Sequence, residues 1–280
     1  MDHVHAHLRA YLSDVAALPG GQLDEDGGML WCRTQIPWPM FNGAIATPEL
    51  GPGDAERAVA ALAGAGLPWF MWVLPDTPAS VVDAAARAGA IEFDQQAPWM
   101  EARIADLAEP ELPGGVTIEE VRDEAGHRLW AAALREIYQF PELGEQAWTM
   151  PGELCGWSDL PWRQWIAFVD GEPAAVTLLY CGGGVAGLFG VGTKQAMRRR
   201  GLGRLVTLLP LQGIGCAAGK LLFNPRWRAP CIAASASSRV DGSAAGWEAC
   251  STRKRSHTPA APRALTPADR DDPPPREERY

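Results

Sequence analysis

The 280-residue sequence contains no apolar run long enough to span a membrane, and its first residues lack the apolar core of a secretion signal. We therefore expect a cytoplasmic protein. The six cysteines are scattered without the paired spacing of a zinc site, so we expect reduced thiols. His3, His5 and His7 alternate and cannot all face one metal ion from a helix, which favours a solvated helical start. We expect no bound metal.

Positive charge is also scarce. The formal net charge is −9, whereas general nucleic-acid binding needs a broad basic surface. The chain lacks Gly-x-x-x-x-Gly-Lys-Ser/Thr, which argues against a nucleotide triphosphatase. It also lacks Gly-x-Gly-x-x-Gly with an acidic ribose ligand, which argues against a dinucleotide fold. In the first 220 residues, positive charge is densest at residues 198–204.

Those residues, RRRGLGR, lie between an apolar run at 188–191, typical of the end of a strand, and a helix-spaced apolar face. The helix face consists of Leu202, Leu205, Val206 and Leu209. Glycines let backbone N–H groups turn inward, and such groups at the start of a helix bind anions. Arginines add donors suited to phosphate oxygens. The segment predicts a pyrophosphate-binding loop; the alternative is a surface arginine cluster that caps an ordinary helix.

The pattern Arg198-x-x-Gly201-x-Gly203 after a strand resembles motif A of the GNAT superfamily of N-acetyltransferases. The resemblance implies that the loop holds the pyrophosphate of acetyl-CoA, and that the pantetheine arm runs along the preceding strand edge. The cofactor-binding residues that it implies are Val191, Gly192, Thr193, Arg198, Arg199, Arg200, Gly201, Leu202, Gly203 and Arg204.

The order of elements extends the resemblance over residues 114–222. We expect a strand at 115–121, a helix capped by Asp123, and a hairpin that turns at Asp170-Gly171. A strand at 185–192 then leads into the loop. This order is similar to the first part of a GNAT domain and implies an acetyl-CoA-binding domain, which is incomplete because the later strands are not recognisable.

Residues 1–108 resemble a degenerate N-terminal half of a tandem GNAT protein, without an arginine-rich loop. We expect helices at 2–18, 53–65 and 79–88, strands at 69–74 and 91–93, and a closing segment at 99–102. Residues 108–114 form a linker. The expected fold class is α+β, with mixed sheets in two acyl-CoA N-acyltransferase-like domains.

Residues 223–280 change abruptly to Ala-, Ser-, Pro- and Arg-rich sequence, and we expect an aberrant or disordered tail. Read in another frame, GC-rich codons for Cys231 to Ser237 can spell His-Arg-Arg-Leu-Gly-Phe, close to a segment that the family carries there. One hypothesis is a frameshift between about residues 211 and 230; the other is a genuine disordered tail. The DNA sequence decides between them.

The resemblance implies an N-acetyltransferase in which a primary amine of a small molecule or peptide attacks acetyl-CoA directly. Backbone N–H groups near Val191 would polarise the thioester carbonyl. No catalytic residue is assigned: Glu142, Glu145 and Glu153 lie in the region of 138–161, an irregular segment expected to cover the acceptor, with solvated carboxylates as the alternative. Other functions left open are a non-catalytic acyl-CoA-binding protein, an inactive product of a frameshifted gene and, disfavoured by charge, a nucleic-acid binder.

Overall fold

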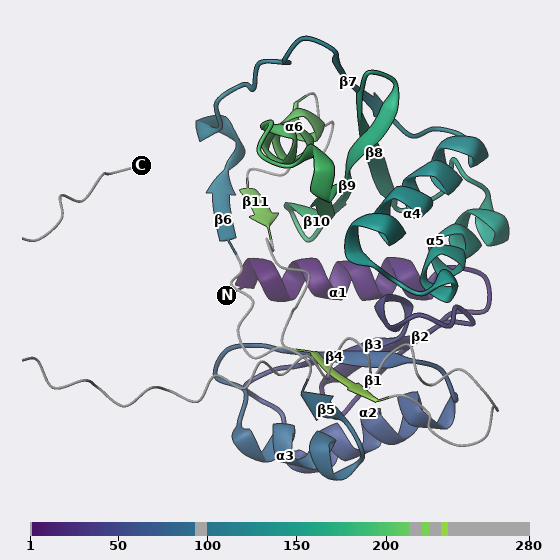
Figure 1. Ribbon diagram of the computed structural model, residues 1–280. Coiled ribbons are helices and arrows are strands. Elements are labelled where there is room, and N and C mark those ends of the chain that lie inside the picture. Colours follow the sequence, from purple (N-terminus) through teal and green to yellow (C-terminus); the bar gives the residue numbers. More distant parts are fainter. Residues whose placement is uncertain (1, 93–99, 213–219, 224–230, 235–280) are drawn as a thin grey trace, which may run out of the picture. The chain divides into compact units, whose positions relative to one another are not determined.

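The computed structural model describes residues 2–92, 100–212, 220–223 and 231–234 (Figure 1). In this part of the chain, the strands form two mixed sheets of six strands each, and helices pack against both. The fold class is therefore α+β, as the sequence predicted.

The first sheet has the strand order β1-β2-β3-β4-β12-β5. Its strands are Gln22–Asp26, Met29–Arg33, Gly43–Ala46, Trp69–Val73, Cys231–Ala234 and Ile91–Glu92, in that order. Helices α2 (Pro52–Gly64) and α3 (Ala79–Arg87) bury their apolar faces against it. The Asp54 carboxylate accepts a 2.8 Å hydrogen bond from the Gly51 N–H and so fixes the start of α2.

The second sheet has the order β6-β11-β10-β9-β8-β7. Its strands are Met100–Arg103, Lys220–Phe223, Val185–Thr193, Glu172–Gly182, Trp162–Val169 and Val116–Glu120. The expected hairpin is confirmed: β8 and β9 are joined through Asp170 and Gly171, whose φ angles of 52° and 84° suit a tight hairpin turn.

Helix α4 (Glu124–Tyr138) is capped as expected, since the Asp123 carboxylate accepts a 2.8 Å hydrogen bond from the Gly126 N–H. The expectation of an irregular segment at 138–161 was wrong. Residues Glu142–Cys155 form helix α5, which continues through Pro151. The helix is held by burial of Trp148, whose ring lies 5.5 Å from that of Trp130 in α4. Tertiary packing therefore outweighs the helix-breaking tendency of proline at this position.

Helix α1 (Asp2–Ala16) packs against strands of both sheets (Figure 1). Leu8 and Leu12 are fully buried, and the Tyr180 hydroxyl of β9 donates a 2.7 Å hydrogen bond to Asp14. We had expected a solvated start of this helix, and this expectation was wrong for His7 and Leu8, which are buried. His7 is buried because it faces β9 and β10, where its Nδ1 lies 3.0 Å from the carbonyl oxygen of Gly182.

One strand of each sheet comes from the part of the sequence that otherwise forms the other sheet. Strand β6 follows the elements of the first sheet but pairs antiparallel with β11, so the segment expected to close the first domain instead extends the second sheet. Strand β12 follows the second sheet but lies between β4 and β5. A boundary at residue 108 therefore does not separate the sheets. The predicted domain ranges remain a proposal, and most of the predicted tail lies outside the described residues.

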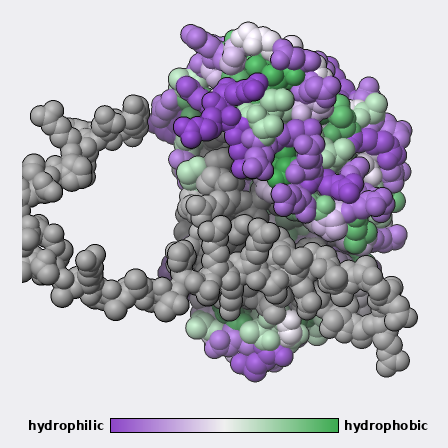
Figure 2. Space-filling model, viewed as in Figure 1, coloured by the Kyte–Doolittle hydropathy of each residue, from purple (hydrophilic) through white to green (hydrophobic). Residues whose placement is uncertain are grey.

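Hydrophilic residues predominate on the coloured surface in Figure 2, with apolar residues scattered among them. Among the described residues, the large apolar side chains that are exposed are Leu23, Met100, Leu112, Leu129, Leu143 and Leu154. None of the described helices combines the length and apolar character required to cross a bilayer.

Candidate cofactor-binding site

Among the described residues, strand β10 has strand partners on both sides over only the first part of its length. It pairs with β9 on one side over most of its course, but with β11 only from Val185 to Leu188. In the described part of the chain, residues 189–193 thus have no strand partner on the β11 side. This free stretch of backbone leads directly to the predicted pyrophosphate loop, and an extended ligand could pair with it as an added strand does.

A β-bulge lies within the same stretch. Phe189 is opposite Leu178 and Gly192 is opposite Val176, so two residues of β10 face one residue of β9. Gly190 within the bulge has φ of 57°, a conformation that glycine adopts without steric cost. Such bulges redirect backbone groups out of the ladder, which suits a site that must present N–H groups to a ligand.

Helix α4 holds the bulge in place. The Tyr138 hydroxyl donates a 2.8 Å hydrogen bond to the carbonyl oxygen of Val191, and Ile137 packs so closely that a Cβ at Gly192 would collide with it. Neither Gly190 nor Tyr138 was among the predicted cofactor-binding residues, and Tyr138 was predicted only as the start of the segment that covers the acceptor. A glycine inside a strand pattern signals a bulge, and Gly190 was that signal; the contact of Tyr138 with Val191 is long-range and has no local signature.

The loop itself is open at its two glycines. Gly201 has φ of 78° and is exposed, and no atom lies within 4 Å of the position that a Cβ would take. Gly203 is half-buried, with 3.7 Å between its would-be Cβ and Oγ1 of Thr193. Helix α6 (Leu202–Leu208) starts here and buries Leu202, which can therefore offer a ligand only its backbone. The glycines are accessible, as a backbone anion site requires.

The arginines of the loop differ from most other arginines of the described residues in having no carboxylate partner there. Arg198 donates a 3.2 Å hydrogen bond from Nε to the carbonyl oxygen of Thr193, and Arg199, Arg200 and Arg204 are exposed. No carboxylate of the described residues pairs with any of the four. By contrast, carboxylates pair with Arg9, Arg57, Arg87, Arg103, Arg122, Arg128, Arg135 and Arg163. In an acidic protein, this leaves uncompensated positive charge concentrated at the loop.

The predicted cofactor residues are thus contiguous in space. Val191, Gly192 and Thr193 are half-buried at the end of β10, and the loop residues 198–204 follow after the short 3₁₀ helix Gln195–Met197. Lys194 is held by a 2.6 Å ion pair with Glu136 of α4, which anchors the strand end just before the loop. The chemistry and accessibility of these residues fit an extended ligand with a diphosphate.

The three carboxylates considered for the acceptor region are not well placed to act as a general base. On α5, Glu145 forms a 2.9 Å ion pair with Arg135, and Glu153 lies 3.0 Å from Arg128. Glu142 is exposed in the first turn of α5. Exposed or ion-paired carboxylates are poor general bases at neutral pH, which favours the alternative of solvated side chains.

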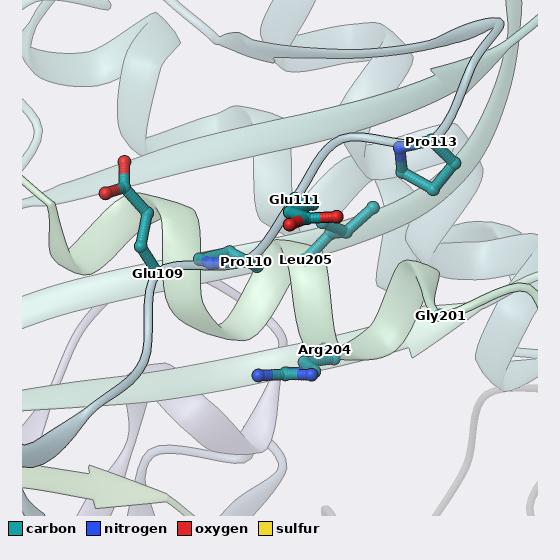
Figure 3. A pocket seen from close by; sticks show the side chains of 7 residues that line it. All are labelled: Glu109, Pro110, Glu111, Pro113, Gly201, Arg204 and Leu205. Atoms are coloured by element: carbon teal, nitrogen blue, oxygen red, sulfur yellow. The ribbon is translucent and has the colours of Figure 1, made fainter.

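A pocket of about 320 Å³ adjoins the loop (Figure 3). It lies between the linker and the start of α6 and is lined by Glu109, Pro110, Glu111, Pro113, Gly201, Arg204 and Leu205. The described residues contain no cluster of three or more His, Cys, Asp or Glu side chains placed to hold a metal ion.

The sequence and the structure were compared with those of known proteins. No protein-family model and no curated protein matches the sequence. Among solved structures, a GCN5-related N-acetyltransferase from Kribbella flavida matches with a TM-score of 0.59 and 18% identity, over 82% of this chain and 93% of that chain. A tandem GNAT protein from the clavulanic acid biosynthesis pathway matches at a TM-score of 0.42 and 14% identity, over 80% of this chain and 77% of its own. The match to the Kribbella flavida structure shows that the described chain has the fold of a GCN5-related N-acetyltransferase, the GNAT fold.

Proposed function

We propose that the protein is a cytoplasmic acyltransferase that moves an acetyl group from acetyl-CoA to a primary amine. The observation that carries the proposal is the exposed Gly201, in a left-handed conformation, after a strand whose residues 189–193 have no partner on the β11 side within the described residues. The arginines around Gly201 form no ion pair with a carboxylate of that part of the chain. A surface arginine cluster that only capped a helix would need neither the bulge nor the open glycine. The GNAT fold supports the same assignment.

Each part of the site has a role in this proposal. Backbone N–H groups around Gly201 and Gly203, with the side chains of Arg198–Arg200 and Arg204, hold the diphosphate of acetyl-CoA. The free edge of β10 at 189–193 aligns the pantetheine arm. The bulge at Gly190 and Val191 presents backbone N–H groups toward the thioester carbonyl.

The reaction needs no covalent intermediate on the protein. The nitrogen of the amine forms a bond to the carbonyl carbon, the C–S bond breaks, and the thiolate takes up a proton while the nitrogen loses one. Because amine and thioester are held together, positioning supplies a large part of the rate enhancement. The acceptor is a small molecule or a peptide that carries a free amine.

A second candidate is a non-catalytic acyl-CoA-binding protein. It is favoured by the ion pairs of Glu145 and Glu153, which leave these α5 carboxylates occupied and not free to accept a proton. The two candidates share the cofactor site and differ only in turnover.

Calorimetric titration with acetyl-CoA tests the shared site, and thiol release across a panel of amines tests turnover. The double variant Arg199→Ala/Arg200→Ala should weaken binding by about tenfold or more, because charge-assisted hydrogen bonds to phosphate are lost. Arg87→Ala is the matched control, since it removes an exposed arginine already paired with Glu56. Binding with turnover supports the enzyme, and binding without turnover supports the second candidate. Absence of binding by the wild-type protein contradicts both.

A further inference from the structure

Helix α1 contacts strand β10 at the residue that precedes the bulge. The ring of His7 stacks on that of Phe189, with centroids 5.7 Å apart and planes at 4°. One turn later on the helix, Tyr11 stacks on the same Phe189 ring at 6.1 Å. Phe189 is therefore buried against two aromatic side chains of α1, and its backbone leads directly into Gly190.

Glycines of the second sheet determine where the His7 ring lies. A Cβ at Gly187 would collide with Nε2 of His7, so the ring approaches the strand only because this position has no side chain. A Cβ at Gly183 would collide with the backbone of Ala6 and His7. The contact of His7 Nδ1 with the Gly182 carbonyl oxygen, at 3.0 Å, sets the orientation of the ring. Both the place and the tilt of the ring are thus fixed.

Hydrogen bonding alone does not account for a histidine here. The side chain is fully buried, and among the described residues its Nε2 has no hydrogen-bond partner. A buried polar atom without a partner costs free energy. The aromatic contacts of the ring with Phe189 and Tyr180 offset that cost. The main contribution of His7 to the structure is therefore its ring.

The position of Phe189 matters because this residue begins the stretch 189–193, which has no strand partner on the β11 side within the described chain. Backbone pairing on that side therefore does not fix the start of the stretch. Its later part is held by α4, through the contacts of Tyr138 and Lys194. Its start is held by α1, through the Phe189 ring.

We propose that His7 is a positioning residue for the cofactor: its ring fixes Phe189, and Phe189 fixes the backbone that aligns the pantetheine arm. This inference rests on the proposed function, which places the arm along residues 189–193. Helix α1 also packs on the first sheet, where Leu12 lies 3.7 Å from the position that a Cβ of Gly43 would take. The first part of the chain thus supports the cofactor-binding strand of the second sheet.

Two substitutions separate the ring of His7 from its hydrogen bond. His7→Asn keeps an N–H group that can donate to the Gly182 carbonyl oxygen but removes the ring. Its affinity for acetyl-CoA, measured by calorimetry, should be about fivefold weaker, a typical effect of losing an aromatic pair. His7→Phe keeps a flat ring without the hydrogen bond and should bind within about twofold of the wild-type protein. The opposite order of the two affinities would overturn the proposal.

A double-mutant cycle tests whether His7 acts through Phe189. Phe189→Leu should also weaken acetyl-CoA binding by about fivefold, because it removes the other ring of the pair. The double variant His7→Asn/Phe189→Leu should bind no more weakly than either single variant, since both changes break the same contact. Independent effects would multiply to about 25-fold and would contradict an action of His7 through Phe189.

Leu12→Val is the control for a general loss of stability in α1. It shortens a fully buried side chain that faces the first sheet, so it should lower the urea midpoint of unfolding and leave the affinity within about twofold. A loss of affinity as large as that of His7→Asn would reduce the role of His7 to general stability.

If His7→Asn does not fold, Gly187→Ala takes its place, because the added methyl group displaces the ring without removing it. It should weaken binding by about fivefold as well. Acetyl-CoA binding by the wild-type protein that neither variant changes overturns the role of His7 and leaves the proposed function intact. Absence of binding by the wild-type protein contradicts both.

Discussion

The hydroxyl of Tyr138 lies 2.8 Å from the carbonyl oxygen of Val191, to which it donates a hydrogen bond. This contact joins the last residue of α4 to the bulge in β10, which lies beyond Val185–Leu188, the stretch that pairs with β11 in the described part of the chain. The ion pair of Lys194 with Glu136 makes a second connection between the same two elements. The end of α4 therefore determines the position of the backbone that we propose aligns the pantetheine arm.

Tyr138→Phe should lower the free energy of unfolding by about 1 kcal/mol, because the Val191 carbonyl loses a hydrogen bond. It should also weaken acetyl-CoA binding several-fold, since the bulge is no longer held. Urea unfolding and calorimetry measure the two effects. Tyr11→Phe makes the same chemical change at a hydroxyl that donates a 3.0 Å hydrogen bond to the Met40 carbonyl oxygen. It should cost similar stability and leave the affinity unchanged; equal affinities in both variants would contradict a role for the Tyr138 contact.

The buried His7 predicts a loss of stability in acid. Burial lowers its pKa from the ordinary value of 6.5, and the hydrogen bond with Gly182 only partly opposes this. The unfolded chain therefore binds a proton below about pH 6.5 that the folded protein does not take up. Stability should fall as pH decreases below that value, by at most about 1.4 kcal/mol per pH unit from this group.

Urea unfolding between pH 5 and pH 8 measures this dependence. Burial also lowers the pKa of His127, so two histidines contribute to the slope. His7→Gln should reduce the slope relative to the wild-type protein without abolishing it. An unchanged slope in this variant would mean that His7 does not titrate differently in the folded and unfolded states.

Because strand β12 is part of the first sheet, we predict that the stability of this sheet depends on residues 231–234, far along the chain from its other strands. Because β12 lies between β4 and β5, a proline there removes an N–H group from the interior of a sheet. Ala233→Pro should destabilise the protein by about 1–3 kcal/mol, the cost of leaving a buried backbone acceptor without its hydrogen-bond donor. Tryptophan fluorescence during urea unfolding reports the change, because Trp69 and Trp72 lie in the neighbouring β4. Unchanged stability would show that β12 contributes nothing to the sheet.

Local signals in the sequence predicted much of this structure. The Asp123 cap, the turn at Asp170-Gly171 and the apolar face of α6 each involve residues close together in the chain, and all three are observed. Gly201 and Gly203 are accessible, as the loop motif Arg198-x-x-Gly201-x-Gly203 led us to expect. Here a small number of neighbouring residues determines the backbone conformation.

The features that the sequence did not reveal depend on distant partners. Helix α5 continues through Pro151 because Trp148 packs against α4 and the 3₁₀ helix around Phe41. His7 is buried because β9 and β10 lie over it, and β6 joins the second sheet because β11 offers an edge. None of these partners can be identified from periodicity or composition, since contact between distant segments leaves no local pattern.

The affinity of Gly201→Glu for acetyl-CoA, measured by calorimetry, tests the central proposal most directly. The matched control is Gly66→Glu: Gly66 is also exposed, has φ of 67°, and has no atom within 4 Å of its would-be Cβ, so both variants carry the same strain and charge. We predict that Gly66→Glu binds acetyl-CoA as tightly as the wild-type protein does. Gly201→Glu should bind acetyl-CoA about a hundredfold more weakly or worse, because its carboxylate fills the diphosphate site and repels the negatively charged diphosphate. Undiminished affinity in a folded Gly201→Glu variant would contradict the assignment of the loop.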